Sequence, residues 1–377
     1  MHHTDIDGPS YPAARTVARR LEARMAASTS AFKNSNSPKP DGRVIEEIVT
    51  KAFWASLRRE EGHAPRISIA FLAPEQSIRP LIFNPQVRLD SDLLARLAPA
   101  VERPGIHIGV WPYDGELCVW GVTRTVPTWC FVLEVVGPGH LVVKYRRDEP
   151  SSKFANIAVL EGADVKFIEQ QSAMISEAPP ALGSLLAFYS SAGRNESDNI
   201  LIKVAIAMRA HGRGGSLLVV PGNTDVWLDS IVQPITYSVI PPFPDIGTFL
   251  QQIKQDLEAP LTLQSAVDAL AGLTAVDGAT VISDQFEPLA FGAKIMSRDG
   301  VHRVEQVLLT EPIEGVSDTT VDPAQLGGTR HLSSAQFAHD QRNAIALVAS
   351  QDGQFTVFAW SSMHKIVHAY RLESLLI

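Results

Sequence analysis

The stretch GGTRHLSSAQFA (residues 327–338) places two glycines, a hydroxyl, an arginine and a histidine at the entrance to a predicted helix. Gly327 and Gly328 let the backbone approach a ligand closely, and the free amides of the following helix carry a partial positive charge. Thr329 adds a hydroxyl, and Arg330 adds a planar fork suited to phosphate oxygens. His331 can donate to a phosphate or, when neutral, bind a metal. The stretch therefore predicts an anion site where a loop enters a helix.

An ordinary structural explanation is equally consistent with these residues. Glycines are common in turns that precede helices, and Arg330 would then pair with a carboxylate. The motif alone leaves both explanations open.

The sequence around this stretch alternates helical and strand-like segments. We expect helices at 197–209, 245–258, 264–272 and 332–342. Strands are expected in GRGGSLLVVPG (212–222), AVDGATVISD (275–284), PLAFGAKI (288–295), AIALVAS (344–350), GQFTVFAW (353–360) and KIVHAY (365–370). Such a mixture predicts an α/β domain with flanking helices around one mixed sheet.

The N-terminal half has a different pattern. From about residue 104 the hydrophobic period is two, and turn signals such as YDGE, GPG and EGAD separate the short segments. This pattern predicts an antiparallel meander. Helical spacing at 12–26 and 41–61 precedes it, with a polar linker between, so we expect an α+β domain with a loosely attached first helix.

The meander also supplies large side chains for a core. We expect its aromatic residues to pack the sheet against the helices, which is favoured over a role in lining a ligand pocket. The two cysteines lack CxxC spacing, and we expect buried thiols in a reducing compartment. The aromatic residues are Trp111, Tyr113, Trp120 and Trp129, and the cysteines are Cys118 and Cys130.

Length and charge limit the possible classes of protein. A chain of 377 residues is too long for one ordinary core. We expect a polar or helical leader and linker over 1–40, the N-terminal domain over 41–180 and the C-terminal domain over 190–377. The net charge of −8 makes nucleic acid an unlikely partner. The sequence lacks an apolar run long enough for a membrane span and the apolar core of a secretory signal, so we expect a cytoplasmic protein.

A second chemical element is Asp277 in VDGATVISD (276–284). A carboxylate beside glycine at a strand edge can accept hydrogen bonds from ribose hydroxyls, and beside a metal it can polarise a hydroxyl for attack on phosphorus. By itself, a plain Asp-Gly turn is the better explanation.

The two elements together resemble the diadenylate cyclase (DAC) domain. DGA at 277–279 is followed by GTRH at 328–331 and by the strand and turn ALVASQDG (346–353). In that family, DGA and RHR motifs frame an ATP site, two sites meet across a dimer, and two ATP become cyclic di-AMP and pyrophosphate. The resemblance implies nucleotide-binding roles for Asp277, Gly278, Ala279, Gly328, Thr329, Arg330 and His331. If the domain is active, it implies catalytic roles for Asp277 and His331.

Two departures from the family pattern bear on activity. Leu332 stands where the family has its second arginine, and this loss should weaken phosphate binding by roughly 1.5–3 kcal/mol. The metal-binding glutamate of the family is absent from SQDG (350–353), where Asp352 can replace it. The resemblance therefore implies Mg²⁺ or Mn²⁺ bound by Asp352, with His331 as a further ligand.

This combination resembles the divergent DAC-like domains classed as probable sensors, the DACNV group. The resemblance implies a sensor that binds an adenine nucleotide or a cyclic dinucleotide, with a second copy of the chain as a candidate partner. An active diadenylate cyclase is the alternative.

Two further motifs carry weaker signals. His364 and His368 have the spacing of helical metal ligands, but their segment alternates as a strand, which favours surface histidines. HGRGG (211–215) can contact a phosphate, although a helix-to-strand turn explains its glycines equally well.

Overall fold

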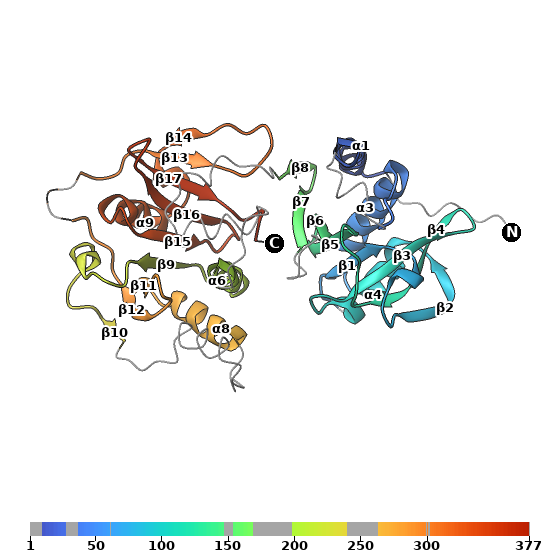
Figure 1. The fold of residues 1–377 in the computed structure, drawn as a ribbon, viewed down its shortest axis with the longest axis horizontal. Helices are drawn as coiled ribbons and strands as arrows, with labels where there is room; N and C mark the ends of the chain where they lie inside the picture. The colour runs from blue at the N-terminus through green and yellow to red at the C-terminus, as the bar shows by residue number, and fades with distance from the viewer. Residues whose placement is uncertain are drawn as a thin grey trace. The chain divides into compact units, whose positions relative to one another are not determined.

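The computed structural model of the chain forms two compact units, each described by itself (Figure 1). The N-terminal unit extends to Ile168, and the C-terminal unit extends from Asp198 to Leu376. The structure describes residues 10–27, 37–60, 62–146, 154–168, 198–239, 263–298, 300 and 302–376.

An α/β fold is confirmed, because each unit contains helices and one mixed sheet. The N-terminal sheet has the strand order β2-β4-β3-β1-β5-β6-β7-β8. Its strands are β1 (Ile67–Phe71), β2 (Leu81–Arg88), β3 (His107–Tyr113), β4 (Glu116–Thr123), β5 (Phe131–Gly137), β6 (His140–Arg146), β7 (Phe154–Glu161) and β8 (Asp164–Phe167).

The predicted meander is present, but β1 divides it. β5 to β8 pair antiparallel in chain order, and β3 and β4 form a separate antiparallel pair. β1 lies between the two groups, parallel to β3 and antiparallel to β5. The sheet is therefore mixed and not purely antiparallel.

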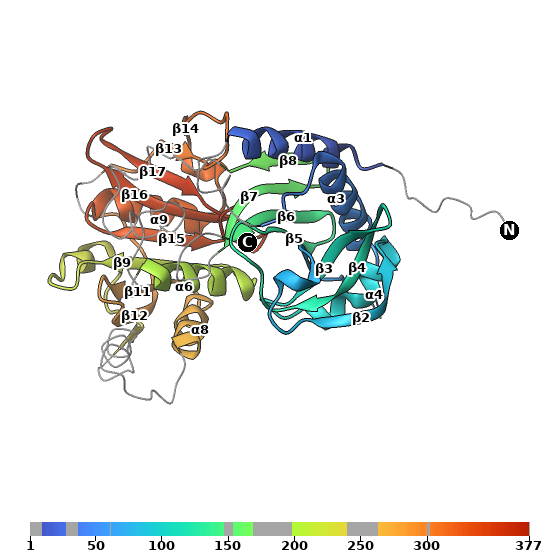
Figure 2. The ribbon, with the colours of Figure 1, turned by 45° about the vertical axis from the view of Figure 1, so that its right-hand side comes forward.

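Helices α1 (Pro12–Ala27), α3 (Gly42–Ser56) and α4 (Ser91–Val101) pack on this sheet (Figure 2). Asp41 caps α3, since its side chain accepts a hydrogen bond from the Val44 amide at 2.9 Å. The expectation of a loosely attached first helix is wrong. Val17 and Leu21 of α1 are fully buried in the same hydrophobic core as α3.

The aromatic residues of the N-terminal unit serve mainly as core packing. Trp120 is fully buried, and its Nε1 donates to the carbonyl of Leu72 at 2.7 Å. Gly109 leaves room for the indole, because a Cβ there would lie 2.1 Å from Trp120. Cys130 is also buried, but Cys118 is only half-buried, so the expectation of two buried thiols holds for one of them.

The C-terminal sheet has the order β10-β12-β11-β9-β15-β16-β17-β13-β14. Most neighbours are antiparallel, but β9 pairs parallel with β11 and β13 with β17. The strands are β9 (Gly215–Val220), β10 (Tyr237–Ser238), β11 (Ala279–Ser283), β12 (Pro288–Ala293), β13 (Val307–Thr310), β14 (Thr319–Val321), β15 (Ile345–Ala349), β16 (Phe355–Ser361) and β17 (Ile366–Arg371).

Helix α9 (Thr329–Asp340) packs across β9, β15, β16 and β17 over a hydrophobic cluster that includes Phe337 and Phe358. Helices α6 (Asp198–Ala210) and α8 (Leu263–Thr274) pack on each other and on the central strands. Every residue of β9 is buried, as expected for a central strand covered on both faces. The helix expected at 245–258 lies outside the described residues.

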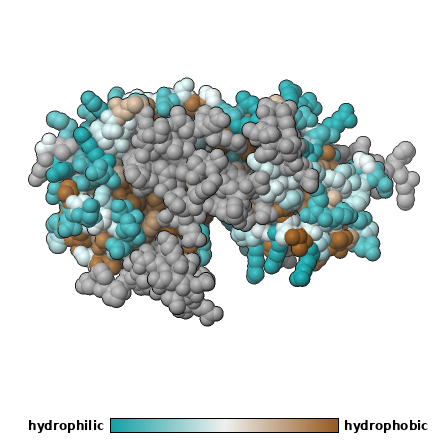
Figure 3. All heavy atoms as spheres, viewed as in Figure 1, coloured by the Kyte–Doolittle hydropathy of each residue, from teal (hydrophilic) through white to brown (hydrophobic). Residues whose placement is uncertain are grey.

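On the face in Figure 3, hydrophobic residues are interspersed with hydrophilic ones over the described parts of both units. None of the described helices is both long enough and apolar enough to cross a membrane.

Candidate functional site

Five residues of the DGA and GTRH motifs meet where the central strands β9 and β11 of the C-terminal sheet begin. Asp277, Gly278, Ala279, Thr329 and Arg330 line a cavity of about 440 Å³, together with Ser216, Ala293, Lys294, Ile295 and Ser333. We name it the Asp277–Arg330 cavity. Its volume lies within the range of small-molecule sites.

The sheet fixes the acidic side of this cavity. β9 and β11 run parallel with Ser216 opposite Ala279, and Ala279 also pairs with Ala293 of β12. Gly278 has a φ of +106°, and a Cβ on it would lie 2.5 Å from the carbonyl carbon of Gly292. Only glycine fits at position 278. The preceding residue, Asp277, is exposed and lies directly before β11.

Helix α9 supplies the cationic side. It begins at Thr329, three residues earlier than the sequence predicted, because extended Gly328 is the N-cap residue. Thr329 and Arg330 therefore belong to the first turn, where backbone amides lack an intrahelical acceptor. Such amides and the helix dipole favour an anion.

Arg330 extends from α9 to the turn that precedes β9. A Cβ built on Gly214 would lie 2.9 Å from Arg330 Nη1. The HGRGG turn (211–215) and the GTRH motif are thus adjacent, although more than a hundred residues separate them in the sequence. A glycine at position 214 therefore serves two purposes: it permits the backbone conformation of the turn, and it leaves room for the Arg330 side chain.

The cavity holds a second cation that the sequence did not indicate. Lys294 follows β12, is exposed and lines the cavity. Within the described part of the chain, neither Lys294 nor Arg330 forms an ion pair. The ordinary structural explanation of the motif requires a carboxylate partner for Arg330, and the described residues do not provide one.

His331 lies away from the cavity. Its side chain is buried, with the ring edge-on to Phe358 at 6.1 Å between centroids. A Cβ on Gly327 would lie 2.3 Å from His331 Nδ1, so Gly327 accommodates the imidazole. Burial lowers the pKa of His331; Asp352 opposes this effect, and Arg371 and Arg330 reinforce it.

The remaining predicted residues also lie outside the lining. Gly328 is exposed at the N-cap, and Asp352 is exposed in the turn between β15 and β16. The Ser350 hydroxyl donates to Asp352 and lowers the pKa of its carboxyl. Leu332 is half-buried and does not line the cavity. Among the described residues there is no group of three or more His, Cys, Asp or Glu side chains placed to hold a metal.

His364 and His368 do not form the predicted pair of surface residues. His368 is buried, and its Nδ1 lies 2.8 Å from the hydroxyl of Tyr370. His364 is exposed, and the two imidazoles stack with centroids 5.2 Å apart.

Comparison with known proteins concerns mainly the N-terminal unit. Residues 34–124 match a family described as "Probable sensor domain DACNV". This segment includes α3, β1, β2, α4, β3 and β4. The motifs at 277–279 and 328–331, which suggested this group, lie outside it. The comparison therefore links the sensor family to the N-terminal unit and leaves a link to diadenylate cyclases as a prediction.

Other comparisons add little. No curated protein matches the chain. A solved structure described as a hypothetical membrane spanning protein from Bacillus cereus is 17% identical, over 50% of this chain and 69% of that chain. Its TM-score of 0.27 is too low to support an argument about fold or function.

Proposed function

We propose that the chain is a sensor whose C-terminal unit binds an adenine nucleotide in the Asp277–Arg330 cavity. The main supporting observation is that Arg330 and Lys294, neither of them in an ion pair among the described residues, line the same cavity as Asp277. The probable-sensor description of the family matched by residues 34–124 agrees with this function.

The cavity holds both positive and negative side chains, which suit the phosphates and the ribose of a nucleotide. Arg330 and Lys294 would bind phosphate oxygens, together with the first-turn amides of α9. The hydroxyls of Thr329 and Ser333 would add hydrogen bonds to the same group. Asp277 would accept hydrogen bonds from ribose hydroxyls.

The proposal assigns His331 no contact with the ligand, because its ring is buried beneath the first turn of α9. A Mg²⁺ or Mn²⁺ ion would be bound by Asp277, the only carboxylate among the described lining residues, and by the phosphates themselves. Binding of a cyclic dinucleotide between two copies of the chain is a further part of the proposal.

Calorimetric titration with ATP, AMP, adenosine and cyclic di-AMP, with and without Mn²⁺, tests this function. We expect ATP to bind at least tenfold more tightly than adenosine, because only ATP has phosphates for the cations. Arg330→Met and Asp277→Asn should each weaken ATP binding about tenfold, which corresponds to about 1.4 kcal/mol. Arg303→Met, which changes an exposed arginine outside the cavity, is the control.

Equal affinities for ATP and adenosine, or undiminished binding by Arg330→Met, would contradict the proposal. The same ATP and Mn²⁺ mixture, analysed for cyclic di-AMP, separates a sensor from a cyclase. We expect no product, since Leu332 and Asp352 depart from the cyclase pattern and lie outside the cavity lining.

A further inference from the structure

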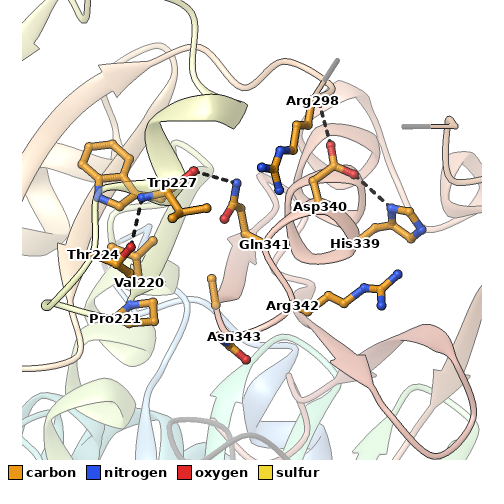
Figure 4. A pocket seen from close by; sticks show the side chains of 12 residues that line it. Val220, Pro221, Thr224, Trp227, Arg298, His339, Asp340, Gln341, Arg342 and Asn343 are labelled. Carbon is orange, nitrogen blue, oxygen red and sulfur yellow. Dashed lines mark hydrogen bonds and ion pairs between the residues drawn. The ribbon is translucent and has the colours of Figure 1, made fainter. Parts of the chain in front are cut away.

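A second cavity, of about 430 Å³, lies at the opposite end of α9 (Figure 4). Its lining includes Val220 and Pro221, which end β9, and residues 339–344, which link α9 to β15. None of its lining residues belongs to the Asp277–Arg330 cavity. The carboxyl ends of strands in mixed α/β sheets are common places for ligands.

A buried carboxylate organises one wall of this second cavity. The side chain of Asp340 is fully buried. Its Oδ2 accepts a hydrogen bond from the backbone amide of Arg298 at 2.9 Å. Its Oδ1 accepts from Gln336 Nε2 at 2.8 Å and lies 2.9 Å from His339 Nδ1. These contacts satisfy the hydrogen-bonding capacity of Asp340 within the protein.

The same contact orients His339. A carboxylate only accepts hydrogen bonds, so Nδ1 is the donor in the His339–Asp340 contact. The imidazole edge also lies against the Trp360 ring, with centroids 5.4 Å apart. One ring nitrogen of His339 is therefore engaged, and its orientation is set by two neighbours.

Of the two arginines that line this cavity, Arg342 is the one without an ion pair among the described residues. Its guanidinium carbon lies 4.2 Å from the centroid of the Trp360 ring, so the aromatic face holds the group in place. Arg342 has no carboxylate partner among the described residues. Arg298 also lines the cavity, but it forms an ion pair with Asp229 at 3.1 Å. Arg342 therefore supplies a positive charge that the protein does not neutralise.

The rest of the lining is largely apolar. Val220, Pro221 and Trp227 contribute hydrocarbon surface. The amide of Gln341 is occupied, because its Nε2 donates to the Val226 carbonyl at 3.0 Å and to Ser230 Oγ at 2.8 Å. A ligand here would contact apolar surface with its body and Arg342 with its charged group.

We propose that this cavity binds a small organic anion, a carboxylate or phosphate ester with an apolar body. Arg342 binds the anionic group, and the surface around Trp227 contacts the body. The proposal does not depend on nucleotide binding in the Asp277–Arg330 cavity.

Ligand-observed NMR titration of the full chain with phenyl phosphate, benzoate and benzyl alcohol tests the proposal. The first two probes distinguish a phosphate from a carboxylate, and the third is neutral. We expect at least one anion to bind at least tenfold more tightly than benzyl alcohol. Arg342→Met should remove this preference, whereas Arg342→Lys should retain part of it.

Two controls identify the cavity that is occupied. Thr224→Trp places a large side chain in the second cavity and should block all binding there, whereas Arg303→Met should change nothing. Probe binding that is lost in Arg330→Met would instead belong to the Asp277–Arg330 cavity.

The proposal is overturned if neither anion binds, if benzyl alcohol binds equally well, or if binding is lost in Arg330→Met and retained in Arg342→Met. Unfolding curves establish that each variant is folded. Arg342 is exposed, so Arg342→Met and Arg342→Lys should both retain the fold.

Discussion

The guanidinium of Arg330 lies over the backbone of Gly214, where a Cβ would come within 2.9 Å of Nη1. This contact joins the turn before β9 to the first turn of α9. The position of the proposed phosphate-binding cation therefore depends on the absence of a side chain at residue 214.

Replacement of Gly214 by alanine should displace Arg330. Gly214 has a φ of +70° and Gly212 a φ of +65°, but a Cβ on Gly212 would meet nothing within 4 Å. Gly214→Ala and Gly212→Ala should each lose about 1–2 kcal/mol of stability from the left-handed backbone. Only Gly214→Ala should also weaken ATP binding, by about tenfold, as measured by calorimetry. Equal ATP affinities for the two variants would show that the contact with Arg330 does not matter for binding.

Lys294 should contribute to phosphate affinity. Lys294→Met removes a cation from the Asp277–Arg330 cavity and should weaken ATP binding about five- to tenfold, which is roughly 1–1.4 kcal/mol. Lys294→Arg keeps the charge and should retain most of the affinity. The loss should shrink as salt rises if the contact is electrostatic. A salt-independent loss, or an equal loss in both variants, would argue against a charge contact.

The glycines at positions 327 and 328 should differ in their tolerance of alanine. A Cβ on Gly327 would lie 2.3 Å from His331 Nδ1, whereas one on Gly328 would meet nothing within 4 Å. Gly327→Ala should lower the free energy of unfolding by about 1–3 kcal/mol, the usual range for overpacking. Gly328→Ala should lower it by under about 1 kcal/mol, as expected at an N-cap. Urea denaturation measures both values, and a reversed order would contradict the tight packing of His331.

His331 should make the protein less stable in mild acid. Burial lowers the pKa of its imidazole in the folded state, so the unfolded chain takes up a proton at a higher pH than the folded chain. Well above pH 6.5, the ordinary histidine pKa, the imidazole is neutral in both states and its titration does not change the free energy of unfolding. As the pH falls from about 6.5 toward the lower pKa of the folded state, protonation of His331 in the unfolded chain lowers the free energy of unfolding.

The free energy of unfolding, measured between pH 7.5 and 5, checks this expectation. His331→Leu should show a smaller loss of stability over this range than the natural chain, whatever its stability at pH 7.5. Parallel pH profiles for the two proteins would contradict the lowered pKa.

The sequence predicted the regularly alternating strands and missed several elements, among them the amphipathic helix α4. The strands and turns after residue 104 were predicted from regular alternation. β1 is buried at every position and β2 is exposed at almost every position, so neither alternates. The short strands β13 and β14 lie in the spacer between the two motifs, where no pattern indicated them.

The candidate site shows a similar limit. The sequence brought Asp277 and Arg330 together through a family resemblance, and the structure places them on one cavity. It assigned Thr329, Arg330 and His331 to one ligand through the GTRH motif. A helix turns about 100° per residue, so Thr329, Arg330 and Ser333 share one face while His331 points into the core with Ala335. Lys294 carried no motif, and only the pairing of β11 with β12 brings it near.

The place of β1 in its sheet has a consequence for the segment that carries the family match. β1 is flanked by β3 on one side and by β5 on the other, with Ile67 opposite Val135. The matched residues end at 124, before β5 begins at Phe131. A fragment cut at that point would leave the backbone of β1, a strand that is buried at every position, open along one side and able to pair with other molecules. The segment that carries the family match therefore ends before the strand that covers this side of β1.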